Sequence, residues 1–272
     1  MASKYWDDQL AARYRDFRYG FPDRALAGRV VVVAGGTGGL GAATVSLLAL
    51  EGARLIVGYR ANRQRALELA CALDQQFQNQ LTLIEGDISS PAVRQAYRDA
   101  VASLNAPLYG AAIFPGDPAR AKFESLDRDA LIASLDANYI GPVLLARDLG
   151  PLLERSEGGG ALVLLATMQA VAQFESSLNY AAPKAALVHA ARILARQWSR
   201  VRVNVVAPGA TVVGMAEASV SAGKYDSFIE NHTIPRFGRP EDVARAVRFF
   251  LEPDNYITGQ VLVVDGGLTL RR

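Results

Sequence analysis

The sequence predicts an α/β protein with one doubly wound parallel sheet of seven strands. Two observations predict this fold class: short valine- and leucine-rich runs alternate with helical stretches from residue 30 to residue 264, and a glycine-rich turn directly follows the first run. Runs that are apolar throughout are typical of strands covered by helices on both faces of a sheet. No stretch has the composition of a linker. We therefore expect a single domain over residues 26–272, preceded by an N-terminal helical extension over residues 1–25.

Val30–Ala34 is the first expected strand, because four valines and an alanine leave no polar position for solvent. Six later runs have the length and the β-branched content of buried strands. We expect these strands at residues 54–57, 81–84, 108–114, 161–166, 201–206 and 261–264.

Helical stretches separate the strands. Residues 63–76 illustrate the pattern, because Ala66, Ala70 and Leu73 fall on one side of a helix whose other positions are polar. The longest stretch should be interrupted at Gly141-Pro142, since proline removes a backbone donor. We expect helices at residues 40–51, 63–76, 91–104, 126–155, 179–198 and 240–251.

Two segments do not follow this alternation. Residues 1–24 mix aromatic residues with arginines, a combination that can stack on nucleic acid. Trp6, Tyr14 and Phe17 fall at helical spacing, so we favour a short amphipathic helix that packs on its own or a neighbouring subunit. Residues 210–238 are long and without a steady period, as expected of an active-site lid.

Charge and cysteine content exclude several classes of protein. The 29 Lys+Arg and 27 Asp+Glu give a net charge of +2, too small an excess to attract nucleic acid or anionic membranes. Cys71 is the only cysteine, which rules out an internal disulfide and fits a reducing compartment. No apolar run has the length of a membrane span, and the N-terminus lacks a signal-peptide core. We expect a cytoplasmic protein without a metal site, since no His/Cys cluster occurs.

Five glycines lie between residues 35 and 41, directly after the first strand. Gly36, Gly38 and Gly41 satisfy the G-x-G-x-x-G pattern, and Gly35, Gly39 and Gly41 satisfy G-x-x-x-G-x-G. Glycine suits a turn with positive φ and lets the backbone approach a pyrophosphate at the positive end of a helix. The sequence therefore predicts a Rossmann-like dinucleotide site, with a packing turn as the alternative.

The end of the second strand bears on which dinucleotide binds. An acidic residue at this position would bond the ribose 2′-hydroxyl of NAD, but the residues here are Gly58-Tyr59-Arg60. Arg60 can pair with a 2′-phosphate, with Arg63 nearby. This favours NADP(H) over NAD(H), which stays open because Arg60 can also be an ordinary solvated charge.

Tyr180 and Lys184 stand four residues apart, so a helix places them on one face. Thr167 follows the strand expected at residues 161–166, and Pro208-Gly209 follows the next strand. Open α/β sheets bind ligands at these carboxyl ends.

With these residues the chain resembles the short-chain dehydrogenase/reductase family, in its single-domain form, over residues 26–268. The motifs that carry the resemblance are Leu26-Ala-Gly-Arg-Val, the glycine loop, Gly86-Asp87-Ile88, Asn138, Tyr180/Lys184, Asn204 to Pro208-Gly209, and Ile257-Thr-Gly-Gln-Val-Leu-Val-Val-Asp265-Gly-Gly267.

The resemblance implies a catalytic tetrad of Asn138, Thr167, Tyr180 and Lys184. Tyr180 would exchange the proton of a carbonyl/alcohol pair while nicotinamide exchanges the hydride. A cation at about 4 Å, at an effective dielectric of about 20, can lower a phenol pKa by roughly three units, so we expect Lys184 to lower that of Tyr180. Asn138 would sustain a water relay to Lys184. Thr167 would orient the substrate oxygen, with the hydroxyl that serine usually provides.

The resemblance also assigns a set of cofactor-binding residues. They are Gly35, Thr37, Gly39, Leu40, Gly41, Tyr59, Arg60, Asp87, Ile88, Gly110, Tyr180, Lys184, Pro208, Gly209 and Thr211. Two departures concern this set. The family's Asn-Asn-Ala-Gly after the fourth strand is matched here to Gly110-Ala-Ala-Ile113, and Gly38 stands where many NADP-dependent members carry a basic residue.

The leading hypothesis is therefore an NADPH-dependent ketoreductase-like enzyme for a small-molecule carbonyl or alcohol. Alternatives are a non-catalytic dinucleotide-binding or redox-sensing module, and imine or enoyl reduction on the same scaffold. By position, Met168, Gln169, Phe174 and Met215 are expected in the substrate pocket. The resemblance further implies a homo-oligomer, a dimer or tetramer.

Overall fold

The computed structural model describes residues 9, 20, 23–78, 81–119, 121–174, 177–213, 222–223 and 234–270. Within them a seven-stranded sheet has the order β3-β2-β1-β4-β5-β6-β7, with every neighbouring pair parallel. The predicted fold class is confirmed. The strands are β1 Val30–Ala34, β2 Arg54–Tyr59, β3 Thr82–Glu85, β4 Leu108–Ile113, β5 Gly160–Leu165, β6 Val201–Pro208 and β7 Val261–Val264.

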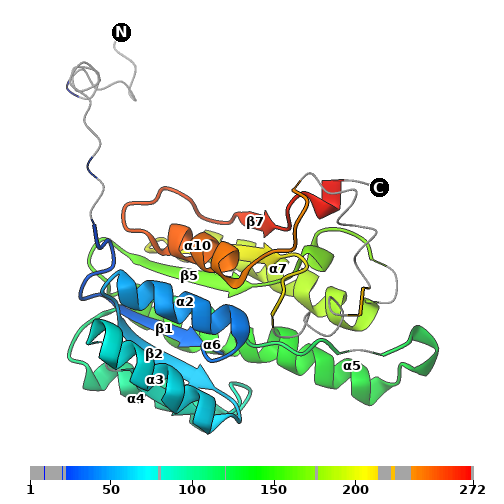
Figure 1. Ribbon diagram of the computed structural model, residues 1–272, viewed down its shortest axis with the longest axis horizontal. Coiled ribbons are helices and arrows are strands. Elements are labelled where there is room, and N and C mark those ends of the chain that lie inside the picture. The colour runs from blue at the N-terminus through cyan, green and yellow to red at the C-terminus, as the bar shows by residue number, and fades with distance from the viewer. Residues whose placement is uncertain are drawn as a thin grey trace.

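Helices cover both faces of the sheet (Figure 1). A hydrophobic core lies on each face of the sheet, and alternate residues of β1 point into one core or the other. Val31 and Val33 pack with α2, α3 and α10, and Val32 packs with α4, α6 and α7. The helices are α2 Gly39–Leu50, α3 Arg63–Phe77, α4 Pro91–Ser103, α5 Arg128–Leu135, α6 Gly141–Leu153, α7 Leu178–Gln197 and α10 Pro240–Leu251, with short turns η2 Phe123–Ser125, η4 Met168–Ala170 and η6 Leu268–Leu270.

The expectation that the long helical stretch is interrupted at Gly141-Pro142 is wrong. Residues 128–153 remain helical throughout, and the irregularity is a π-helical turn, η3 Asp136–Ile140, between α5 and α6. The amide of Gly141 donates to the carbonyl of Asp136, five residues back. Because Pro142 has no amide hydrogen, the helix widens by one residue instead of breaking. Asn138 lies within this π turn and is fully buried.

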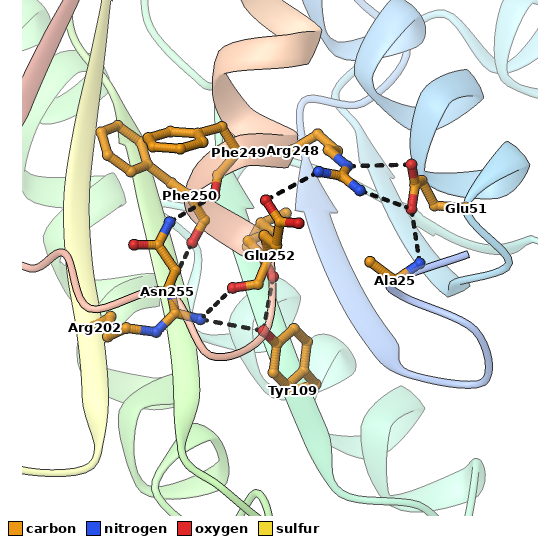
Figure 2. A network of polar contacts seen from close by, with 10 residues as sticks. Ala25, Glu51, Tyr109, Arg202, Arg248, Phe249, Phe250, Glu252 and Asn255 are labelled. Carbon is orange, nitrogen blue, oxygen red and sulfur yellow. Dashed lines mark hydrogen bonds and ion pairs between the residues drawn. The ribbon is translucent and has the colours of Figure 1, made fainter. Parts of the chain in front are cut away.

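A polar network ties the amino ends of the strands to the end of α10 (Figure 2). Arg202 on β6 donates to the carbonyl oxygens of Phe250 and Glu252 and to the Tyr109 hydroxyl, which in turn donates to the carbonyl of Leu251. These bonds satisfy carbonyls at the helix end, as required where a helix stops against the core. They lie at the edge of the sheet opposite to the carboxyl ends of the strands.

Two segments that the sequence singles out fall largely on residues that the structure does not describe. Apart from residues 9, 20 and 23–25, the N-terminal extension lies outside the described residues, and so do most of residues 210–238. No described helix is long and apolar enough to cross a membrane. Among the described residues there is also no group of three or more His, Cys, Asp or Glu side chains placed to hold a metal ion.

Candidate active site

A cavity of about 390 Å³ lies along the carboxyl ends of strands β2, β1, β4, β5 and β6. The sheet runs β3-β2-β1 in one direction and β4 to β7 in the other, so the cavity spans the point where the strand order reverses. It gathers residues that are far apart in sequence. The sequence-predicted residues that line it are Gly35, Thr37, Gly39, Leu40, Gly41, Tyr59, Arg60, Asp87, Ile88, Thr167, Tyr180, Lys184, Pro208, Gly209 and Thr211.

The glycine loop forms one wall, and three of its glycines are sterically required. A Cβ on Gly41 would lie 2.2 Å from the carbonyl oxygen of Gly35, and one on Gly39 would lie 2.1 Å from a methyl of Val213. Gly35 itself has φ +73°, a conformation that glycine adopts without strain. Helix α2 begins at Gly39, so its positive end faces the cavity. A backbone cradle of this kind fits a pyrophosphate.

Arg60 follows β2 and is exposed at the cavity rim. Within the described part of the chain, no hydrogen bond or ion pair holds its guanidinium. The neighbouring carboxylate, Glu85 on β3, accepts a 2.9 Å hydrogen bond from the Tyr59 hydroxyl. The guanidinium of Arg60 is therefore available to an anionic group in the cavity.

Arg94 on α4 supports the segment that follows β3. Its guanidinium donates to the carbonyl oxygens of Ile88 at 2.9 Å and of Ser89 at 2.6 Å, and forms a 2.8 Å ion pair with Asp148 on α6. Burial opposes ionisation of Asp148, but hydrogen bonds from Arg147 and Arg94 outweigh it and lower the pKa of the carboxyl. Ile88 is thus fixed against the cavity by a buried cation.

Thr167, Tyr180 and Lys184 meet at the end of β5. Thr167 comes two residues after the strand, and Tyr180 and Lys184 lie one turn apart on α7. The Thr167 hydroxyl hydrogen-bonds the Tyr180 phenol. The Nζ atom of Lys184 donates to the carbonyl oxygens of Leu165 at 2.9 Å and Pro115 at 3.3 Å.

The expectation that Lys184 lowers the pKa of Tyr180 is not what the structure shows. The pKa of Tyr180 is raised to about 12: burial is the largest cause, the bond from Thr167 opposes it only in part, and the charge of Asp117 acts in the same direction as burial. Burial also lowers the pKa of Lys184 to about 7. An ammonium that is only partly charged at neutral pH, and that already bonds two carbonyls, cannot stabilise a phenolate as a full cation would.

Asn138 does not line the cavity and instead supports the loop behind it. Its side-chain amide donates to the carbonyls of Asp117 at 2.9 Å and Ser134 at 3.0 Å, and its Oδ1 accepts the Asp117 amide at 3.1 Å. A Cβ on Gly116 would lie 2.7 Å from Asn138 Oδ1 and 3.0 Å from Lys184 Nζ. Asn138 and Lys184 therefore both approach the backbone of residue 116, which has room for them because it is a glycine.

Gly110, which was expected among the cofactor-binding residues, does not line the cavity. Gly110 lies inside β4, where an added Cβ would meet Leu251 and Val31, and it is not part of the cavity wall. The register pairs Ala34 with Ile113, so the chain reaches the carboxyl edge only after residue 113. Phe114, Pro115 and Gly116 form the wall there.

Other wall residues were not singled out by the sequence. Pro115-Gly116 after a strand is a turn signal that could have identified this loop. Tyr97 gave no such signal, because an aromatic residue inside a helix is ordinary core material. The further wall residues include Tyr97, Phe114, Pro115, Gly116, Asp136, Ala137 and Val213.

Two of the four expected substrate-pocket residues lie together, but not in the cavity described above. Gln169 and Phe174 line a separate hollow of about 550 Å³ beside the start of α7. Met168 is 3% exposed and packs in the core. Met215 lies outside the described residues.

Comparisons with known proteins agree with this geometry. A family model described as enoyl-(acyl carrier protein) reductase matches residues 34–269. The chloroplastic NADPH-dependent aldehyde reductase 2 of Arabidopsis thaliana is 28% identical over 266 residues, which cover 92% of this chain and 97% of that protein. Carbonyl reductase family member 4 of Danio rerio is 31% identical over 247 residues, which cover 89% of this chain and 98% of that protein.

A comparison with solved structures also finds dehydrogenases with the same fold. A short chain dehydrogenase from Burkholderia cenocepacia, determined in complex with NADP, matches with a TM-score of 0.82 at 27% sequence identity. The match covers 90% of this chain and 99% of that chain.

Proposed function

Because this chain belongs to the short-chain dehydrogenase/reductase family, whose members are oxidoreductases, we propose that it reduces a carbonyl compound with NADPH, or oxidises the corresponding alcohol. One observation carries the proposal. A single cavity holds the Thr167, Tyr180 and Lys184 cluster at β5 and the glycine cradle and Arg60 at β1 and β2. Proton-transfer groups and a phosphate cradle along one cavity are what hydride transfer from a dinucleotide requires.

The proposed cofactor is NADP(H), with NAD(H) as the alternative. The Gly41 and Gly39 backbone fits a pyrophosphate, and the exposed Arg60 guanidinium, which pairs with none of the described residues, fits a 2′-phosphate. The relative from Arabidopsis thaliana is named as NADPH-dependent, and the structure from Burkholderia cenocepacia contains NADP. Both support the choice.

When bound, the reduced cofactor would supply the hydride that attacks the carbonyl carbon. Tyr180 then donates its phenolic proton to the developing alkoxide oxygen. The raised pKa of about 12 keeps this proton on Tyr180 at neutral pH, as a general acid needs. Thr167 bonds the phenol and would orient the substrate oxygen.

Lys184 and Asn138 act on the walls of the cavity. Lys184 holds the end of β5 and the loop at Pro115 through its two carbonyl contacts. Asn138 fixes the same loop from behind through Asp117. Together they keep residues 115–117 in place beside Tyr180.

Enoyl reduction is a second candidate, because the matching family model carries that description. Steady-state assays with NADPH and matched panels of ketones, aldehydes, imines and enoyl thioesters distinguish the reactions. Turnover of carbonyl compounds supports the proposal, and turnover of enoyl thioesters or imines alone replaces it. Tight NADPH binding with no turnover of any panel would point to a binding or sensing module.

A further inference from the structure

Tyr97 on α4 is a buried side chain whose hydroxyl has no hydrogen-bond partner in the described part of the chain. It is 1% exposed, yet none of the described residues hydrogen-bonds its hydroxyl. Burial raises its pKa, with no neighbouring charge or hydrogen bond contributing. The same residue belongs to the wall of the cavity described above. A hydroxyl at a cavity wall, on a side chain that is otherwise buried and without a partner among the described residues, is available to a ligand group at that position.

Gly58 on β2 makes room for this phenol. A Cβ at residue 58 would lie 1.5 Å from the Tyr97 hydroxyl oxygen and 2.8 Å from the ring carbon that bears it. Any other residue type would displace the phenol from the edge of β2. The pair of Gly58 and Tyr97 therefore brings a hydroxyl to the carboxyl end of this strand.

The surroundings indicate which group the hydroxyl meets. Gly58 directly precedes Tyr59 and Arg60, and α4 begins just after Ile88, so the phenol lies at the β2 and β3 end of the cavity. In open dinucleotide-binding sheets the adenosine half lies at the end of the second strand. A phosphate there would pair with the exposed Arg60, whereas a largely buried phenol in a wall that also contains the apolar Ile88 suits an uncharged heteroaromatic ring.

We propose that the Tyr97 hydroxyl hydrogen-bonds the adenine base of the bound dinucleotide. The proposal rests on the proposed function, since it takes the cavity to be a dinucleotide site. A phenol can donate to a ring nitrogen or accept from an exocyclic amine, and a purine offers both. Tyr97 is thus a residue for binding the cofactor base, remote from the reacting atoms.

Calorimetric titration with separate halves of the cofactor tests this. The ligands are adenosine 2′,5′-bisphosphate, reduced nicotinamide mononucleotide and NADPH, and the proteins are wild type, Tyr97→Phe and Tyr109→Phe. Loss of one neutral hydrogen bond should weaken adenosine 2′,5′-bisphosphate and NADPH by about three- to tenfold in Tyr97→Phe. The affinity for reduced nicotinamide mononucleotide should not change.

Tyr109→Phe is the matched control. Tyr109 is also buried, but its hydroxyl is bonded to Leu251 and Arg202 at the opposite edge of the sheet (Figure 2). This variant should melt below wild type and bind all three ligands unchanged. Tyr97→Phe, which loses an unpartnered hydroxyl, should melt at or above the wild-type temperature in the absence of ligand.

The outcomes separate the two claims. Wild-type affinity of Tyr97→Phe for adenosine 2′,5′-bisphosphate overturns the role of Tyr97, and so does an equal loss for reduced nicotinamide mononucleotide. Failure of wild type to bind NADPH overturns the proposed function instead. Gly58→Ala keeps the hydroxyl but displaces it, so it should show the same selective loss and provides the test should Tyr97→Phe not fold.

Discussion

The Nζ atom of Lys184 donates a 2.9 Å hydrogen bond to the carbonyl oxygen of Leu165, the last residue of β5. This contact ties α7 to the carboxyl edge of the sheet and buries the amine almost completely. The position of Tyr180 one turn earlier on the same helix follows from it. The same burial shifts the pKa values of both side chains away from the charged forms.

Tyr180→Phe should reduce kcat by at least about 100-fold, because general acid catalysis contributes about 10²- to 10⁴-fold and Thr167 cannot replace the phenol proton. Binding of NADPH, followed by its fluorescence, should stay within about threefold of wild type, since the ring remains and the change removes one neutral hydrogen bond at most. Full turnover in this variant would contradict the assigned role.

Lys184→Met should change how stability depends on pH. The pKa of Lys184 in the folded protein is about 7, against an ordinary 10.5, so the unfolded chain binds more protons than the native state between these values. The free energy of unfolding of wild type should therefore rise with pH above 7, by up to about 1.4 kcal/mol per pH unit from this group.

Urea unfolding at pH 7, 8 and 9 measures that slope. Lys184→Met should show a smaller slope than wild type, whereas Lys122→Met, at an exposed position, should keep the wild-type slope. Parallel curves for wild type and Lys184→Met would show that Lys184 does not lose its proton in this range.

Asp117→Asn should lower the pKa of Tyr180, because the charge of Asp117 is one of the causes that raise it. The asparagine oxygen can still accept the amide of Ala119, now bonded at 2.8 Å. Alcohol oxidation requires the phenolate as base, so the rising limb of kcat/KM against pH should move to lower pH. A profile that superimposes on wild type, or moves to higher pH, would contradict the effect of Asp117.

Arg60→Ala should weaken NADPH by about 10- to 100-fold and leave NADH nearly unchanged, since a charge-assisted contact to a 2′-phosphate exists only with NADPH. The dissociation constants of both cofactors, measured by fluorescence titration, check this. Arg65→Ala provides the control, because Arg65 is exposed on α3 and is not part of the cavity wall. An equal loss for both cofactors would assign Arg60 another role.

The order of strands and helices could be read from the sequence because it depends on local pattern. Val30–Ala34 is apolar at every position and is buried at every position. The glycine loop could also be predicted, since five glycines directly after the first strand leave few alternatives to a tight backbone turn. Tyr180 and Lys184 could be paired because helical spacing alone puts them on one face.

Tertiary structure decided what depends on register and burial. The cavity wall after β4 begins at Phe114 and not at Gly110, because pairing with β1 sets where the strand ends. Asn138 faces a loop instead of the cavity, because the π turn rotates it toward Asp117. Tyr97 on α4 reaches the cavity only because Gly58, on strand β2, has no side chain.

The sequence by itself thus determined the fold class and the residues that local spacing brings together. It could not determine the pKa values of Tyr180 and Lys184, because these depend on how much water the surrounding chain excludes. Desolvation is a property of packing among segments distant in sequence, and here it outweighs the attraction that their spacing on one helix suggests.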